Sequence, residues 1–136
     1  MLMNLSGTSF NKVDIGLVRG DLVVIHRETS NKFDNDSQPA YAVYYEGLRI
    51  GYIPAIETVK RKMIEAKRAG NNKDWAYHNE RVNELIYLRD CIYTDIERNH
   101  ITPIGTIYNY FWIDDEAGMN DKGIGNPSIT IDMDYQ

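Results

Sequence analysis

The sequence lacks the features that mark secreted and membrane-spanning proteins. It has a single cysteine, Cys91, so no disulfide can form within the chain, and a reducing, cytoplasmic compartment is expected. No stretch approaches the roughly 18 consecutive apolar residues of a membrane-spanning helix. The opening residues, MLMNLSGTSF, have neither the basic nor the apolar segment of a signal peptide. We therefore expect a cytoplasmic protein with no membrane partner.

An excess of positive charge is also missing. The 136 residues include 15 Lys and Arg against 20 Asp and Glu, a formal net charge of −5. This balance argues against a protein that coats duplex DNA by bulk charge. The charge is uneven, because residues 1–80 carry 11 basic and 10 acidic side chains whereas residues 81–136 carry 4 and 10. An anionic ligand should therefore prefer surfaces built by the first part of the chain.

Motifs for metals, cofactors and catalysis are absent too. The three histidines fall in separate elements and, with Cys91, show no metal-ligand spacing. The acidic run Asp114–Asp121 lacks the pattern of a calcium loop. We expect no cofactor, no metal and no enzymatic activity. Asp132 and Asp134 could form the carboxylate pair of a metal-dependent nuclease, but the solvated face of a strand explains them better.

What the sequence does contain is a β pattern on both sides of a helical segment. Apolar residues at three- and four-residue steps, from Ile56 to Ala66 and again after Asp74, predict a two-helix hairpin over about residues 55–97. Alternation and turn residues predict six short strands around it. The expected fold is one mainly β, α+β domain over residues 1–136, a small OB- or SH3-like barrel with the hairpin inserted. The predicted strands are Phe10–Val13, Asp21–Arg27, Ala40–Tyr45, Leu48–Ile53, Ile101–Ile113 and Ser128–Tyr135.

Five short motifs in residues 5–54 follow one another in the order of a known family. They are Gly7-Thr8-Ser9-Phe10, Arg27-Glu28-Thr29, Asn31-Lys32-Phe33-Asp34, Ala40-Tyr41-Ala42-Val43 and Ile50-Gly51-Tyr52-Ile53-Pro54. In this the sequence resembles the HIRAN family, small β-barrel domains attached to fork-remodelling helicase-like ATPases and also found alone in bacteria and phages. It departs from the family where Phe33 replaces a tyrosine and Lys32 replaces a proline.

The resemblance implies a DNA-binding module that recognises the 3′-hydroxyl end of single-stranded DNA in repair or replication. Phe10 and Phe33 would stack on terminal bases, and Asp34 would accept a hydrogen bond from the free hydroxyl. Polar neighbours would complete the pocket, and the basic face of the first helix would follow backbone phosphates. The candidate DNA-binding residues are Phe10, Arg27, Asn31, Phe33, Asp34, Tyr52, Lys60 and Arg61.

Structural interpretations of the same residues stay open. Asp34 is typical of a turn, Phe33 can plug the mouth of a barrel, and the Lys60–Arg68 face can be simply solvated. A second function also stays open, a non-catalytic interaction or inhibitor protein of phage or mobile-element origin. It would bind a protein partner through the acidic C-terminal third, where alternation places Tyr108, Tyr110 and Trp112 on one strand face.

Overall fold

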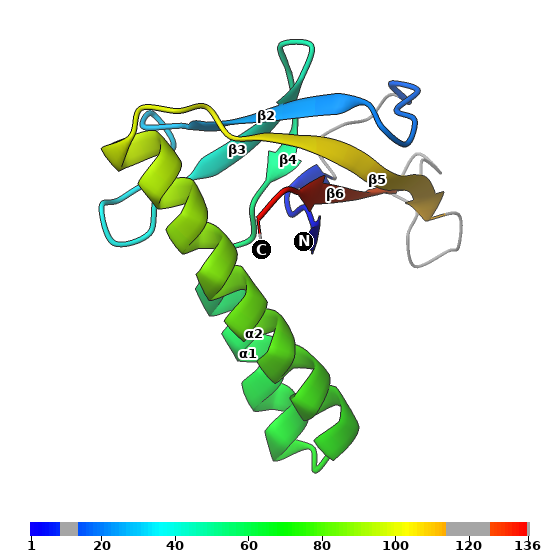
Figure 1. Cartoon of the computed structure of the whole chain (residues 1–136). Coiled ribbons are helices and arrows are strands. Elements are labelled where there is room, and N and C mark those ends of the chain that lie inside the picture. The colour runs from blue at the N-terminus through cyan, green and yellow to red at the C-terminus, as the bar shows by residue number, and fades with distance from the viewer. Residues whose placement is uncertain (9–13, 114–125, 136) are drawn as a thin grey trace.

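The computed structural model describes residues 1–8, 14–113 and 126–135, and its centre is one antiparallel sheet of six strands (Figure 1). The spatial order is β1-β6-β5-β2-β3-β4, so the strands nearest the two ends of the chain, β1 and β6, lie side by side. The protein is therefore an α+β domain that is mainly β. The strands are β1 (Leu2–Asn4), β2 (Leu22–Arg27), β3 (Tyr41–Tyr45), β4 (Leu48–Tyr52), β5 (Ile104–Ile113) and β6 (Asn126–Met133).

The two edges of the sheet come together at one point. Ser6, just after β1, and Tyr52 of β4 exchange two backbone hydrogen bonds, each with an N···O distance of 2.9 Å. Among the described residues the pairing of the two edges is limited to this isolated bridge, so the sheet is not closed by a continuous ladder. The closed barrel thus stays a prediction, whereas the antiparallel sheet is observed.

The predicted strands from residue 21 onward are observed, with ends that differ by a few residues. The predicted strand Phe10–Val13 lies outside the described residues. The first observed strand, β1, was not predicted, because three residues are too short to show alternation. Its position depends on a distant partner, since Met3 lies opposite Ile131 of β6 and buries its side chain.

The hydrophobic core lies between one face of the sheet and the second helix. Alternating residues of β2, β3, β5 and β6 point into it, and three residues of α2, Leu85, Leu88 and Ile92, cover them. A fully buried side chain of this size stabilises the fold by about 1.5–3 kcal/mol. The sheet residues in this layer include Val23, Ile25, Tyr41, Val43, Ile107, Ile129, Ile131 and Met133.

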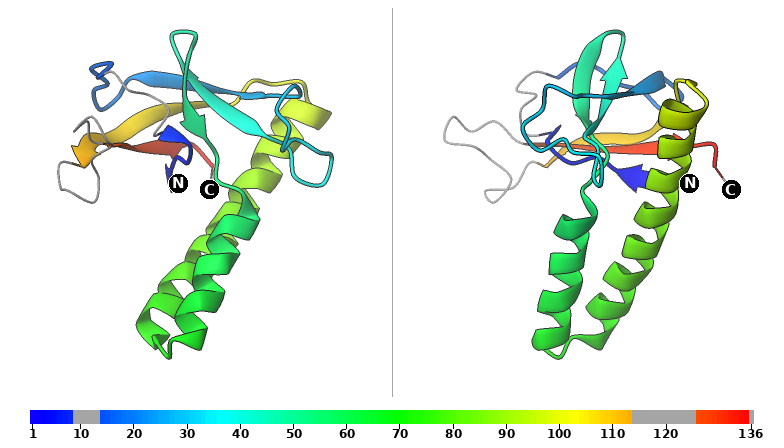
Figure 2. Two further views of the ribbon diagram at one scale, coloured as in Figure 1. Left: turned by 180° about the vertical axis from the view of Figure 1, so that it is seen from behind. Right: turned by 90° about the vertical axis from the view of Figure 1, so that its left-hand side faces the viewer.

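The predicted helical hairpin is confirmed. It consists of α1 (Ile56–Arg68) and α2 (Asn72–Tyr93), and α2 continues into a short π-helix, η2 (Thr94–Arg98). The turn between them uses Gly70 at φ +71° and Asn71, whose side chain accepts a hydrogen bond from the Asp74 backbone amide. No residue of α1 is fully buried. The far half of the hairpin therefore projects from the sheet as two packed helices (Figure 2).

Strand β5 contains a β-bulge, which changes which of its side chains share a face. Ile107 pairs with Ile131 and Asn109 pairs with Thr130, so Tyr108 has no partner and the alternation changes at this residue. As a result Tyr108 is exposed, whereas Tyr110 and Trp112 are half-buried. The prediction that these three aromatics share one face is wrong, because an inserted residue reverses the side-chain direction.

None of the helices described in the structure has the length and hydropathy needed to cross a membrane.

Candidate nucleic-acid interface

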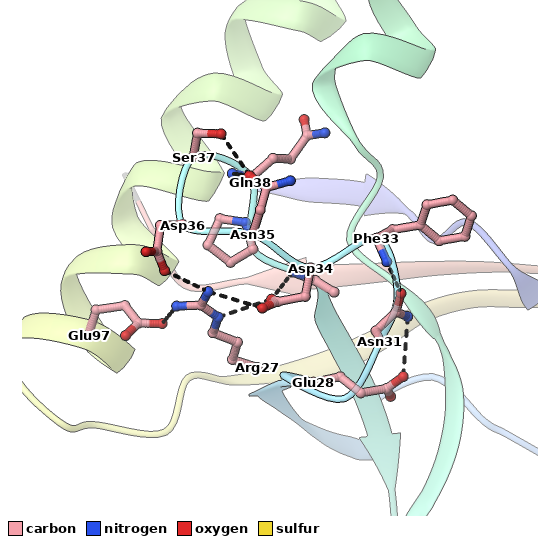
Figure 3. Close-up of polar contacts among 12 residues, drawn as sticks. Arg27, Glu28, Asn31, Phe33, Asp34, Asn35, Asp36, Ser37, Gln38 and Glu97 are labelled. Atoms are coloured by element: carbon pink, nitrogen blue, oxygen red, sulfur yellow. Dashed lines mark hydrogen bonds and ion pairs between the residues drawn. The ribbon is translucent and has the colours of Figure 1, made fainter.

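The loop between β2 and β3, residues 28–40, carries most of the predicted site. Asn31 shapes it, because its side-chain oxygen accepts from the Phe33 amide at 2.8 Å and its carbonyl accepts from the Asp34 amide at 3.0 Å. This turn sends Phe33 and Asp34 to opposite sides (Figure 3). Phe33 and Asp34, which belong to one predicted motif, therefore lie in two different environments.

On one side of the loop the Arg27 guanidinium forms hydrogen bonds with three carboxylates. Its guanidinium donates to both oxygens of Asp34, at 3.0 and 3.1 Å, and to Glu97 of η2 at 3.0 Å. A longer bond of 3.2 Å reaches Asp36, whose side chain is fully exposed. We call these four residues the Arg27 cluster (Figure 3). The two hydrogen bonds between Arg27 and Asp34 fix the relative orientation of the two side chains in addition to pairing their charges.

Asp34 is fully engaged within the fold. Besides Arg27 it accepts a hydrogen bond from the Ala40 amide at 2.8 Å, and its side chain is only 8% exposed. The Arg27 guanidinium lowers the pKa of Asp34, with a further contribution from the Ala40 amide. The predicted partners Arg27 and Asp34 are thus together, but the carboxylate binds the protein itself rather than facing the open groove described below.

On the other side the central carboxylate is Glu28. It accepts from the Tyr52 hydroxyl at 2.9 Å, from Asn31 at 3.2 Å and from Arg49 at 3.2 and 3.3 Å. Burial raises the pKa of Glu28, but the hydrogen bonds from Tyr52, Arg49 and Asn31 outweigh it, and the pKa is lowered overall. Glu28 and Arg49 were not predicted as site residues, although Glu28 belongs to one of the five motifs.

An open groove of about 940 Å³ lies on this side of the loop. Phe33 stands at its wall with 73% of its surface exposed, and the Lys32 ammonium lies 5.0 Å from the centre of the Phe33 ring. Tyr52 also lines the groove, with the Arg49 guanidinium 5.2 Å from its ring. Two aromatic rings, each next to a cation, therefore line one hollow that also contains the Glu28 carboxylate.

Buried Arg89 of α2 also lines the groove. Its guanidinium donates to three backbone carbonyls, those of Pro39 at 2.8 Å, Pro54 at 2.9 Å and Ile53 at 3.1 Å. It lies 5.4 Å from the ring of Tyr41, whose buried hydroxyl has no hydrogen-bond partner in the described structure. Burial, and then the charge of Glu97, raise the pKa of Tyr41 to about 12. Arg89 thus ties the 28–40 loop and the end of β4 to the helix.

The remaining predicted residues lie elsewhere. Lys60 and Arg61 are exposed on α1 and do not line the groove, although Ala55 and Thr58 at the start of that helix do. Phe10 lies outside the described residues. Sequence reasoning thus found Asn31, Phe33 and Tyr52 of the groove, and it missed the residues whose role depends on distant partners.

No group of three or more potential metal ligands is present among residues 1–8, 14–113 and 126–135. Asp132, one of the two carboxylates considered for a nuclease, accepts a hydrogen bond from the amino group of Met1 at 2.9 Å. The acidic run Asp114–Asp121 falls outside the described residues.

The groove can hold a flat ring against Phe33 or Tyr52 and an anion next to Lys32 or Arg49. It can also present the carboxylate of Glu28 to a hydroxyl group. Comparison with protein-family models, with curated proteins and with solved structures finds no match for this chain.

Proposed function

We propose that this chain is a non-catalytic, cytoplasmic module that binds the 3′-hydroxyl end of single-stranded DNA in the groove beside the 28–40 loop. The observation that supports this proposal best is the exposure of the Phe33 side chain at the groove. A phenylalanine that is 73% exposed contributes nothing to the core, yet it stands at a groove next to Lys32. Stacking on an exposed ring contributes about 1–3 kcal/mol per base and accepts any base.

The cations of the groove suit the phosphates of such a strand. Lys32 is exposed, and Arg49 is 45% exposed, with hydrogen bonds of 3.2 and 3.3 Å to Glu28 that are long for a charged pair. Arg49 can therefore turn from Glu28 to a phosphate at little cost. That movement frees an acceptor position on Glu28.

In this proposal the terminal hydroxyl donates to Glu28, and Asp34 positions the loop. A hydroxyl end gains a charge-assisted hydrogen bond, whereas a terminal phosphate is repelled by the same carboxylate. Asn31 and Tyr52 hold Glu28 in place by the bonds described above. We also propose that the sheet forms a barrel. Ser6 and Tyr52, which bridge the two sheet edges, both line the groove, so the proposed site lies where the two edges meet.

Fluorescence anisotropy with single-stranded oligonucleotides ending in a 3′-hydroxyl or a 3′-phosphate tests the proposal. We expect tighter binding of the hydroxyl end, and we expect Glu28→Gln to reduce that preference. Glu80→Gln, at an exposed carboxylate of α2, is the matched control and should leave the preference unchanged. Absent binding, or equal binding of the two ends, would refute end recognition.

A second candidate is a protein-interaction or inhibitor function, and the exposed aromatics of β5 favour it. Tyr108 is 36% exposed with the Arg19 guanidinium 4.3 Å from its ring, and Phe111 is 48% exposed. Aromatic and arginine side chains are enriched in protein interfaces. A pull-down from lysate of the source cells should then recover a protein that is lost with the double variant Tyr108→Ala/Phe111→Ala. Recovery of nucleic acid alone would count against it.

A further inference from the structure

The groove does not end at the loop, because α1 continues it. Ala55 and Thr58, at the start of α1, line the groove together with Phe33. The side chain of Gln38, from the same loop, accepts a hydrogen bond from the Ile56 amide at 3.2 Å and so fixes this junction. A ligand strand that leaves the groove past Thr58 therefore meets the surface of α1.

The basic residues of α1 divide into two sets by their positions around the helix. With about 100° per residue, Lys62 lies about 40° from Thr58, Arg61 about 60° and Arg68 about 80°. Lys60 and Lys67 lie about 160° and 180° away, on the opposite flank. Only the first set shares a face with the part of α1 that lines the groove.

These side chains are unpaired and carry a local excess of charge. The sequence of α1 contains five basic and two acidic residues, in a chain whose net charge is −5. In the described part of the chain, none of the ion pairs involves a residue of α1. The helix packs mainly against α2, with Ile56 and Val59 also against the core, and its basic side chains are exposed and open to a ligand.

We propose that a single-stranded nucleic acid held in the groove continues along the Thr58 face of α1, with its phosphates next to Arg61, Lys62 and Arg68. This inference rests on the proposed function and extends its footprint by the length of α1, about 20 Å for 13 residues. The occupant is a single strand rather than a duplex, because one helix face offers a narrow row of cations and the rest of the chain is acidic. Glu65 lies on the same face and opposes binding.

The test compares two charge-matched double variants on oligonucleotides of about 4 and about 12 nucleotides, lengths that lie within the range of about 4–16 nucleotides covered by single-strand-binding OB folds. Arg61→Gln/Lys62→Gln removes two cations from the proposed face. Lys60→Gln/Lys67→Gln removes two from the opposite flank, so the proposed path excludes Lys60, although the sequence predicts it as a candidate DNA contact. We expect only the first variant to bind the longer oligonucleotide more weakly. The shorter one, which fills the groove alone, should bind both variants like the wild type.

Salt gives a second readout. Each lost phosphate contact should reduce the slope of log K against log salt by about 0.7, so two contacts reduce it by about 1.4. The advantage of the wild type over Arg61→Gln/Lys62→Gln should then shrink about sevenfold when salt rises fourfold. Glu65→Gln should strengthen binding of the longer oligonucleotide.

The outcomes separate the two proposals. If the wild type binds neither oligonucleotide, the proposed function fails and this inference fails with it. If the shorter one binds but the two double variants behave alike on the longer one, the groove stands and the path along α1 is wrong. Tighter binding of a duplex than of the longer single strand would also overturn the path.

Discussion

The two sides of the 28–40 loop differ in how completely their charged groups are satisfied. In the Arg27 cluster, Asp34 is 8% exposed, Arg27 is 16% exposed, and both are engaged in several bonds. In the groove, Phe33 is largely exposed and Arg49 is 45% exposed on long bonds. A satisfied, shielded cluster stabilises a conformation, whereas exposed rings and loosely held cations are available to a ligand. One loop therefore separates residues engaged within the fold from residues that remain available to a ligand.

The largest effect on stability is expected at Arg89, which ties the 28–40 loop and the end of β4 to α2. Arg89→Met leaves the carbonyls of Pro39, Ile53 and Pro54 without their donor, and we expect the free energy of unfolding to fall by about 3 kcal/mol. Urea denaturation measures this. Arg98→Met, at an exposed arginine of η2, is the control and should stay within about 0.5 kcal/mol. Equal effects of the two variants would show that Arg89 is no anchor.

A smaller loss of stability is expected at Arg27. Arg27→Met leaves Asp34 shielded without its cation, and because Arg27 is partly exposed we expect a cost of about 2 kcal/mol, below the value for fully buried pairs. Arg27→Lys keeps the charge but not the two-point contact and should cost less. Thermal or urea unfolding of both variants decides the comparison. An Arg27→Met protein as stable as the wild type would show that the Arg27 cluster does not stabilise the fold, and the difference between the two sides of the 28–40 loop would not hold.

Phe33→Ala should separate binding from stability. We expect the affinity for single-stranded DNA to fall by about 1–3 kcal/mol, or roughly 5- to 150-fold, because a stacking surface is lost. The free energy of unfolding should change by less than about 0.5 kcal/mol, since the ring is exposed. Phe111→Ala, at an exposed aromatic outside the groove, is the control for both anisotropy and urea measurements. A large loss of stability at Phe33 would mean that the ring is structural after all.

The smallest effect concerns pH and tests the Arg27 cluster alone. The pKa of Asp34 is lower in the folded protein than its ordinary value of 3.8, so its stabilisation is complete above that value and is lost as the pH falls through the folded pKa. Between about pH 5 and pH 2, wild-type stability should therefore fall more steeply than that of Asp34→Asn. Asp36→Asn, at a fully exposed carboxylate with one bond to Arg27, should follow the wild type. Parallel curves for all three proteins would contradict the role of Asp34.

Local patterns predicted much of the fold. The strands around Val23–Ile25 and Ile129–Met133 show alternation, and the helices show apolar residues at three- and four-residue steps, so their positions could be read from the sequence. The bulge at Tyr108 and the short strand β1 could not, because each is defined by pairing with β6. Backbone pairing across more than a hundred residues leaves no periodic trace in a three-residue segment.

The site was predictable in part. The turn around Asp34 follows from local chemistry, since Asn and Asp favour such turns. The exposure of Phe33 does not, because a ring that plugs the mouth of a barrel fits the same sequence. The partners of Arg27 and Arg89 come from other elements, so motif reasoning could place neither Glu97 nor the Pro39 carbonyl. The resemblance to the HIRAN family pointed to Asp34, whereas the carboxylate that lines the groove is Glu28.

By itself, then, the sequence determined the strands from residue 21 onward, the helical hairpin, the turn around Asp34 and the separation of charge along the chain. The tertiary structure alone decided which charges are engaged within the fold and which remain available. Arg27 meets Glu97, and Arg89 meets Pro39 and Pro54, only because the end of α2 packs against the sheet beside the 28–40 loop. The physical reason is that a charged side chain is satisfied by whatever packing brings within about 3 Å, and packing depends on the whole chain.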